Sequence, residues 1–186
     1  ALNSTYPKDK LYSDSPMITE ACRTCENWDE KDMIYVIGAV NEGQLKSMWV
    51  VHGACYAADR AVYERVKNKI SVGINELSDV AFAETNELGR VNKVDPLGLT
   101  YLRIRGMWGI EHPRKVFSFA NSKPDGEALT LNAVFLKSKF EAFPAKDRLL
   151  LESQTGRDFT ITPIKIKSPN NPAQLLDAVH MRFVKK

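Results

Sequence analysis

Four residues in the first third of the chain have the types and spacing of a metal site. Cys22 and Cys25 form a C-x2-C pair, and His52 and Cys55 form an H-x2-C pair after a spacer of 26 residues. Two thiolates on a tight turn, with an imidazole and a thiolate at the start of a helix, are ligands that tetrahedral Zn²⁺ takes. Four protein ligands leave no open position for water, so such an ion stabilises the fold without catalysing a reaction.

The cysteine pair has other interpretations. C-x-x-C can be a redox pair or a disulfide between near neighbours, and His52 can be an ordinary polar residue. A redox pair normally lies at a strand-to-helix junction of a βαβ unit, and no such pattern surrounds Cys22. A secreted disulfide framework favours an even number of cysteines, whereas this chain has three. We therefore expect a structural zinc ion bound by Cys22, Cys25, His52 and Cys55.

The same residues carry a resemblance to a known family. The order C-x2-C, spacer, W-x2-H-x2-C, with Trp49 ahead of His52, resembles the zinc finger of poly(ADP-ribose) polymerases. The stretch Asp9-Lys10-Leu11-Tyr12 is also similar, and the resemblance covers about 50 of the 186 residues. It implies zinc ligation, with DNA ends as the ligand. Two features differ from that family: Val51 stands where an aromatic residue usually precedes the histidine, and the spacer is acidic.

A second group of residues is basic and aromatic and lies in the second half of the chain. Side chains alternate between the faces of a strand, so Tyr101, Arg103 and Arg105 share one face of the stretch Leu99–Arg105. Cations beside exposed rings hold single-stranded nucleic acid, because the cation binds phosphate and the ring stacks on a base. The candidate nucleic-acid contacts are Tyr101, Arg103, Arg105, Trp108, Lys115, Lys137, Lys139, Lys165 and Lys167. The competing interpretation is a half-solvated antiparallel sheet whose rings face the core.

The distribution of charge also indicates that an anionic partner would bind to the second half of the chain. Residues 1–90 contain 10 Lys and Arg against 14 Asp and Glu, whereas residues 91–186 contain 16 against 9. The net charge of +3 therefore hides an acidic half and a basic half. We expect the basic half to contact any nucleic acid.

Periodicity predicts the elements that position these groups. The apolar run Met33–Val40, a turn at Asn41-Glu42-Gly43 and the run Leu45–Val51 predict a β-hairpin. Small apolar residues at three- and four-residue spacing predict a helix from about Ala54 to Lys69, followed by a short helix over Asn75–Leu88. One further helical turn is predicted at Ala173–Ala178. The remaining stretches of the second half are predicted to be strands: Leu99–Arg105, Lys115–Ala120, Ala128–Lys139, Arg148–Glu152, Phe159–Lys167 and Val179–Val184.

Together these elements predict an α+β protein. An N-terminal zinc-stabilised hairpin-plus-helix module would lead into a β-rich antiparallel body, either a sandwich or a small barrel. The expected parts are a polar arm at residues 1–20, the zinc module and helices at 21–92, and a basic body at 93–186, unless these form one continuous domain. No stretch is long and apolar enough to span a membrane, and the N-terminus lacks a signal-peptide core. We expect a location inside the cell, in the nucleus or cytoplasm.

The sequence motifs indicate a non-catalytic function. No G-x-S-x-G, Gly-rich phosphate loop, H-E-x-x-H or paired-carboxylate motif is present, and His112 and His180 have no nucleophile motif near them. We expect a zinc-stabilised protein that binds DNA or RNA through phosphate contacts and stacking, with self-association as a further property. The alternative is a structural or assembly subunit, such as a viral coat or virion component, that uses residues 1–20 for contacts between copies. An enzyme would need His112 or His180 in a pocket with a carboxylate.

Overall fold

The polypeptide forms two units, which are described separately. The fold is that of a computed structural model, and it describes residues 2–15, 18–75, 81–82, 88–92, 94–97, 99–120 and 129–185. Residues 8–59 and 111–186 form one unit, here called the sheet unit, and residues 1–7 and 60–110 form the other, here called the helix unit. The chain therefore enters the sheet unit, leaves it for the helix unit, and returns.

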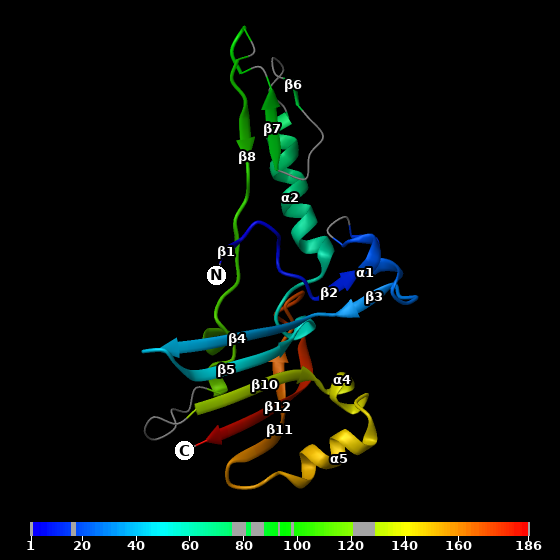
Figure 1. Ribbon diagram of the computed structural model, residues 1–186, viewed down its shortest axis with the longest axis vertical. Coiled ribbons are helices and arrows are strands. Elements are labelled where there is room, and N and C mark those ends of the chain that lie inside the picture. The colour runs from blue at the N-terminus through cyan, green and yellow to red at the C-terminus, as the bar shows by residue number, and fades with distance from the viewer. Residues whose placement is uncertain are drawn as a thin grey trace. The chain divides into compact units, whose positions relative to one another are not determined.

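A mixed five-stranded sheet is the centre of the sheet unit (Figure 1). Its spatial order is β11-β12-β10-β5-β4, and every neighbouring pair is antiparallel except β5 and β10, which are parallel. The predicted α+β class is confirmed, but the sheet is mixed rather than antiparallel. The strands are β4 (Ile34–Asn41), β5 (Gln44–His52), β10 (Leu129–Leu136), β11 (Phe159–Lys167) and β12 (Leu175–Lys185).

The hairpin of β4 and β5 confirms the predicted strand–turn–strand pattern. Asn41 pairs with Gln44, so a two-residue turn of Glu42 and Gly43 joins the strands. Both turn residues have positive φ, 50° and 73° respectively. Positive φ at both central positions is the type I′ geometry, whose twist matches that of the flanking strands.

The two faces of the sheet are covered by different helical segments. On one face, Phe140 of α4 (Lys137–Glu141) packs with Val179 and Met181 of β12, and Leu151 of α5 (Ala145–Ser153) packs against them. On the other face, the buried Trp49 ring stacks on Phe117, with ring centroids 6.0 Å apart. Phe117 lies between α3 (Pro113–Val116) and the 3₁₀ turn η2 (Ser118–Ala120).

Three predicted elements of the sheet unit are wrong. The predicted strand Lys115–Ala120 is helical, because the His112 side chain caps α3 and Pro113 begins it, a position that proline favours. The predicted strand Arg148–Glu152 lies within α5, and the predicted helical turn Ala173–Ala178 overlaps the start of β12. By contrast, the prediction for Phe159–Lys167 matches β11, and β10 occupies most of the predicted strand Ala128–Lys139, whose residue 128 lies outside the described residues.

The helix unit contains one long helix and a narrow ribbon. The helix α2 (Arg60–Asn75) begins six residues later than predicted, after the 3₁₀ turn η1 (Gly53–Cys55) of the sheet unit. The ribbon consists of β6 (Ala81–Phe82), β7 (Gly89–Asn92) and β8 (Leu102–Ile104), and β1 (Leu2–Asn3) pairs with β9 (Trp108–Gly109). The predicted helix over residues 75–88 meets the strand β6 at 81–82, and its residues 76–80 and 83–87 lie outside the described residues.

A small layer of short elements completes the sheet unit. The strands β2 (Lys10–Tyr12) and β3 (Glu30–Asp32) pair antiparallel, and α1 (Glu20–Thr24) lies between them in the sequence. The Gly53 amide donates a hydrogen bond to the Met33 carbonyl at 2.7 Å, and a Cβ atom at Gly53 would overlap the carbonyl oxygen of Asp9. Glycine is therefore required where the chain leaves β5. Among the described residues, no helix has the length and apolar character needed to cross a membrane.

Candidate functional site

The four predicted zinc ligands occupy two different environments. Cys22 lies in α1, whose N-terminus is capped by Thr19, and Cys25 directly follows this helix; both cysteines are exposed. His52 and Cys55 are buried at the end of β5 and in η1. All four residues are described, and no group of three or more His, Cys, Asp or Glu in the described part of the chain is placed to hold a metal ion. The described residues thus show no zinc-stabilised module, and zinc ligation stays a prediction.

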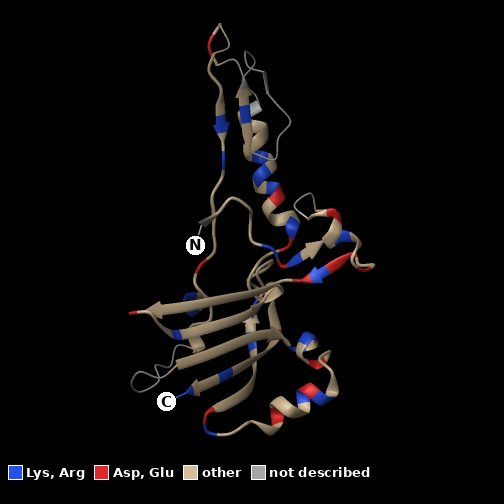
Figure 2. Ribbon diagram, viewed as in Figure 1, with Lys and Arg blue, Asp and Glu red and all other residues tan. Residues whose placement is uncertain are grey.

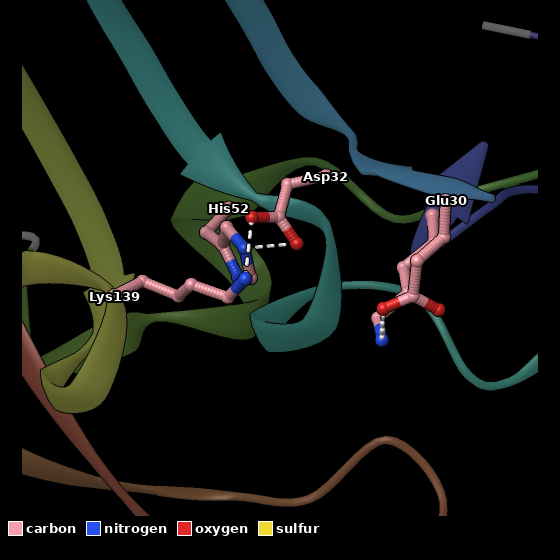
Figure 3. Close-up of polar contacts among 5 residues, drawn as sticks. Glu30, Asp32, His52 and Lys139 are labelled. Carbon is pink, nitrogen blue, oxygen red and sulfur yellow. Dashed lines mark hydrogen bonds and ion pairs between the residues drawn. The ribbon is translucent and has the colours of Figure 1, made fainter. Parts of the chain in front are cut away.

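Polar side chains meet instead at one end of the mixed sheet (Figure 3). Asp32 Oδ2 lies 2.7 Å from Lys139 Nζ, and Asp32 Oδ1 lies 3.4 Å from His52 Nε2. The parallel strands β5 and β10 bring His52 and the start of α4 to the same end of the sheet, and Asp32, the last residue of β3, lies two residues before the start of β4, which runs the other way. We call Asp32, His52 and Lys139 the sheet-end cluster.

Burial and charge set the protonation states within the sheet-end cluster. Burial lowers the pKa of His52 below its ordinary value of 6.5, and the Asp32 carboxylate only partly opposes this, so the imidazole is neutral at pH 7. Partial burial acts to raise the pKa of Asp32, but Lys139 and His52 outweigh it and the net pKa is lowered. Neither ring nitrogen of His52 has hydrogen-bond geometry with a described residue. Nearby, burial raises the pKa of the Cys55 thiol to about 12.

The sheet-end cluster presents only part of itself to solvent. The His52 side chain is 2% exposed, whereas the side chains of Asp32 and Lys139 are 32% and 40% exposed. A solute could therefore reach the carboxylate and the ammonium but not the imidazole. The Asp32 carboxylate can orient the Lys139 ammonium, and the neutral His52 imidazole behind them is a proton acceptor.

The predicted contact residues on the sheet unit are mostly engaged with carboxylates of the same chain. Lys115 pairs with Glu111 at 2.8 Å and Lys165 pairs with Asp177 at 2.7 Å. Lys137 lies 3.7 Å from Glu141, and Lys139 belongs to the sheet-end cluster. Exposed pairs of this kind contribute about 0–1 kcal/mol, so an anion could compete for them, but they do not form one cationic face. Lys167 is exposed at the end of β11.

The predicted contact residues on the helix unit form a more coherent surface. Arg103 lies in β8, Tyr101 and Arg105 flank this strand, and all three residues are exposed. Figure 2 shows basic residues on both β7 and β8 of the ribbon. Arg90 of β7 lies directly opposite Arg103 in the antiparallel register, and its Cζ lies 5.2 Å from the centroid of the Tyr101 ring. One face of the ribbon therefore carries three arginines and a tyrosine, here called the cationic ribbon face: Arg90, Tyr101, Arg103 and Arg105.

The opposite face of the ribbon packs toward α2. A Cβ atom at Gly89 would come within 2.9 Å of Ile74 Cγ2, and Val91, two residues along the same strand, is buried. Alternation then turns Arg90 away from α2. The Asp95 carboxylate orders the connection between β7 and β8, because it accepts hydrogen bonds from the amides of Leu97, Leu99 and Thr100. Hydrogen bonds from Thr100 are the main cause that lowers the pKa of Asp95 to about 2.

Trp108, the remaining predicted contact, is a packing residue in the helix unit. Its ring meets Tyr6 and Tyr63 edge-on, at centroid distances of 6.0 and 5.8 Å, and Tyr6 stacks on Tyr63 at 5.2 Å. These contacts hold β9 and the N-terminal segment against α2. The ring is only partly exposed, in contrast to Tyr101.

Sequence reasoning missed two residues of these sites. Arg90 lies outside the predicted strands, and only the pairing register of β7 with β8 shows that it belongs beside Arg103. Asp32 lies in the acidic stretch between Cys25 and His52, and its place just before the predicted strand Met33–Val40, with His52 at the end of the partner strand, could have indicated the contact.

Comparison with known proteins gives consistent matches. The model of the NgoPII restriction endonuclease family matches residues 1–167. The type II restriction enzyme NgoPII of Neisseria gonorrhoeae is 45% identical over 179 residues, which is 96% of this chain and 64% of that enzyme. The chain thus spans less than two thirds of the length of this relative. No solved structure matches the chain.

These matches overturn four expectations. The resemblance to the zinc finger of poly(ADP-ribose) polymerases is wrong, because the family match runs through the same residues and continues to residue 167. The interpretation as a zinc-stabilised, non-catalytic binder is wrong, because both matches are to enzymes. The alternative of a viral coat or virion component, and the expectation that the protein is more likely not an enzyme, are wrong for the same reason.

Proposed function

Because the chain belongs to the NgoPII restriction endonuclease family, we propose that the protein cleaves double-stranded DNA at specific sites, as a type II restriction enzyme. The observation that carries this proposal is the identity of 45%, which extends over 96% of the chain. We also propose that the protein acts inside the cell, where its DNA substrate is found. We propose DNA as the nucleic acid that the protein binds, where the sequence alone left both DNA and RNA open.

The cationic ribbon face is the surface that best supports contact with DNA. Guanidinium groups donate paired hydrogen bonds to phosphate oxygens and remain charged at all physiological pH values. Arg103 and Arg105 would bind backbone phosphates, and the Tyr101 ring would pack on a sugar or base beside them. The lysines of the sheet unit would add weaker contacts, since most of them already have a carboxylate partner.

The described residues do not fit a nuclease metal centre. Enzymes that hydrolyse phosphodiesters commonly use divalent ions that stabilise the attacking and leaving oxygens. Such ions need several oxygen or nitrogen ligands, and no group of three or more His, Cys, Asp or Glu among the described residues is placed to supply them. The Asp32 carboxylate is already paired with Lys139. We therefore assign to the described residues the binding and positioning of DNA.

Digestion of DNA tests the proposed activity. The purified protein is incubated with a circular plasmid and a linear phage DNA in a buffer containing Mg²⁺. We expect a fixed set of fragments from each DNA, unchanged on longer incubation, because cleavage stops when every specific site has been cut. A smear, progressive shortening from the ends, or intact DNA with a folded protein would contradict the proposal.

A pair of variants connects the activity to the cationic ribbon face. At protein concentrations below saturation, Arg103→Gln combined with Arg105→Gln should slow cleavage at least tenfold, because each phosphate contact is a charge-assisted hydrogen bond of about 1.5 kcal/mol or more. Arg157→Gln, an exposed substitution on the sheet unit, is the matched control and should cleave at the original rate.

A further inference from the structure

The connection between β7 and β8 displays two leucines at the end of the ribbon (Figure 1). The side chains of Leu97 and Leu99 are 82% and 77% exposed, the highest values among the large apolar side chains of the described residues. A single exposed leucine needs no explanation, but two on one turn form a small apolar surface that projects from the fold. We call Leu97 and Leu99 the leucine tip.

A closed, hydrogen-bonded turn holds the leucine tip. The Val94 amide donates a hydrogen bond to the Thr100 carbonyl at 3.1 Å, which closes the turn at its base. Inside the turn, the Asp95 carboxylate accepts hydrogen bonds from the amides of the two leucines at 3.0 and 3.2 Å, so one side chain fixes the backbone of both. Pro96 restricts the turn further, because its ring fixes φ. The leucines are thus presented in advance, and a ligand need not order the backbone that carries them.

The chain around the leucine tip is basic. Residues 89–106 contain four Lys and Arg against one acidic residue, a balance of +3, and the helix unit as a whole contains 8 Lys and Arg against 6 Asp and Glu. Ion pairs within the unit leave this net charge unchanged, so the unit attracts a polyanion. DNA is a polyanion that also has an apolar interior, because flat base faces stack between its two rows of phosphates. A protein partner fits less well, since a stable protein interface buries about 800 Å² on each side and two leucines supply only a fraction of that.

We propose that Leu97 and Leu99 insert between adjacent base pairs of DNA and act as a wedge that partly unstacks and kinks the duplex. The wedge rests on the proposed function, and it adds a contact with the base stack that cleavage does not specify. Proteins that kink DNA insert leucine and other apolar side chains in this way and bend the duplex by about 20–90°. The apolar side chains replace part of the stacking contact that the bases lose. Pyrimidine–purine steps, which unstack most easily, would accept the wedge at the lowest cost.

A fluorescent base tests the wedge. The adenine analogue aminopurine brightens when it loses its stacking neighbours, so a series of duplexes carries it at successive positions across the cleavage site that the ends of the digestion fragments define. With the wild type bound and the duplex uncut, we expect the fluorescence to rise at one base step. Leu97→Ala combined with Leu99→Ala should remove this rise and weaken binding about tenfold, because the apolar contact is lost. Leu149→Ala combined with Leu150→Ala, which truncates two exposed leucines of α5, is the matched control and should behave as the wild type.

The salt dependence of binding separates a wedge from a phosphate contact. A leucine neutralises no phosphate, so the slope of log affinity against log salt concentration should be the same for the leucine-tip variant and the wild type. A smaller slope for the variant would overturn the wedge.

The remaining outcomes separate the wedge from the proposed function. If the wild type cuts at specific sites but no position brightens, or if the leucine-tip variant brightens the same position equally, the wedge is wrong while the proposed function stands. A dimer that only the wild type forms, without unstacking, would assign the leucine tip to contact between copies and would also overturn the wedge. If the folded wild type yields no specific fragments, the proposed function fails, and the wedge fails with it.

Discussion

Two of the three histidines are buried, and burial keeps both of them neutral. His180 Nε2 lies 3.0 Å from Asn132 Oδ1, on the neighbouring strand, and the side chain is packed edge-on against Phe119. Burial, with the nearby Arg182 charge as a smaller cause, lowers the pKa of His180 to about 4. His180 thus has an amide partner rather than the carboxylate that a catalytic histidine would need, and His112 caps α3. Both residues have structural roles that their sequence context did not reveal.

The pKa of His180 predicts a loss of stability in mild acid. Its pKa is lower in the folded protein than in the unfolded chain, so the unfolded chain takes up the proton first as the pH falls below about 6.5. The stabilisation is complete above pH 6.5 and disappears as the pH falls toward 4. Between these values the protonation of His180 should lower the free energy of unfolding by about 1.4 kcal/mol for each pH unit. Urea denaturation at several pH values measures this slope.

One variant identifies the group responsible. His180→Gln cannot take up a proton in this range, so its unfolding free energy should fall less steeply with pH than that of the wild type. Equal slopes for His180→Gln and the wild type would show that His180 is not buried as described.

At the scale of elements, the chain is tightly constrained at the end of β5. Gly53 follows His52 directly, and its amide is bonded to Met33 while Asp9 crosses close behind it. Asp9 is itself buried, and burial raises its pKa, so backbone and side chain are both tightly packed here. This crossing fixes the direction in which His52 enters the sheet-end cluster.

Substitution of Gly53 should therefore be costly. Gly53→Ala places a methyl group on the Asp9 carbonyl, where backbone must move, and we expect a loss of about 1–3 kcal/mol of unfolding free energy. Gly156→Ala is the control, because nothing lies within 4 Å of a Cβ atom at that position. Chemical denaturation of both variants checks the difference, and equal stabilities would contradict the close approach.

At the scale of the whole molecule, basic character and the ribbon together predict electrostatic binding of DNA. Residues 91–186 carry the excess of Lys and Arg, and the cationic ribbon face combines residues of this half with Arg90. Binding through phosphates releases counterions, so the affinity should fall steeply with salt. The protein should bind duplex DNA at 50 mM salt at least tenfold more tightly than at 200 mM, as fluorescence anisotropy would measure. An affinity unchanged over this range would exclude phosphate contacts as its source.

The sequence predicted local features better than distant ones. The hairpin at Asn41–Gln44 could be predicted because the turn residues and the flanking apolar runs are contiguous. The parallel pairing of β5 with β10 could not be predicted, since residues 53–128 separate the two strands in the sequence. The spacing of the cysteine and histidine residues predicted a zinc site. Spacing alone, however, does not show whether the side chains of α1 and η1 point toward one centre. Arg90 was missed because cross-strand register is a three-dimensional property.

The order of the strands has a consequence for how the protein is made. The strand β12 lies between β10 and β11, yet it is the last of the five to leave the ribosome. Until its residues emerge, β10 and β11 have no common neighbour, and their apolar side chains stay open to chaperones or to aggregation. Sheet closure must then wait until residues 175–185 have been synthesised, and contacts between such distant segments form slowly. A cell producing this protein would accumulate partly formed sheets whenever translation stalls before residue 175.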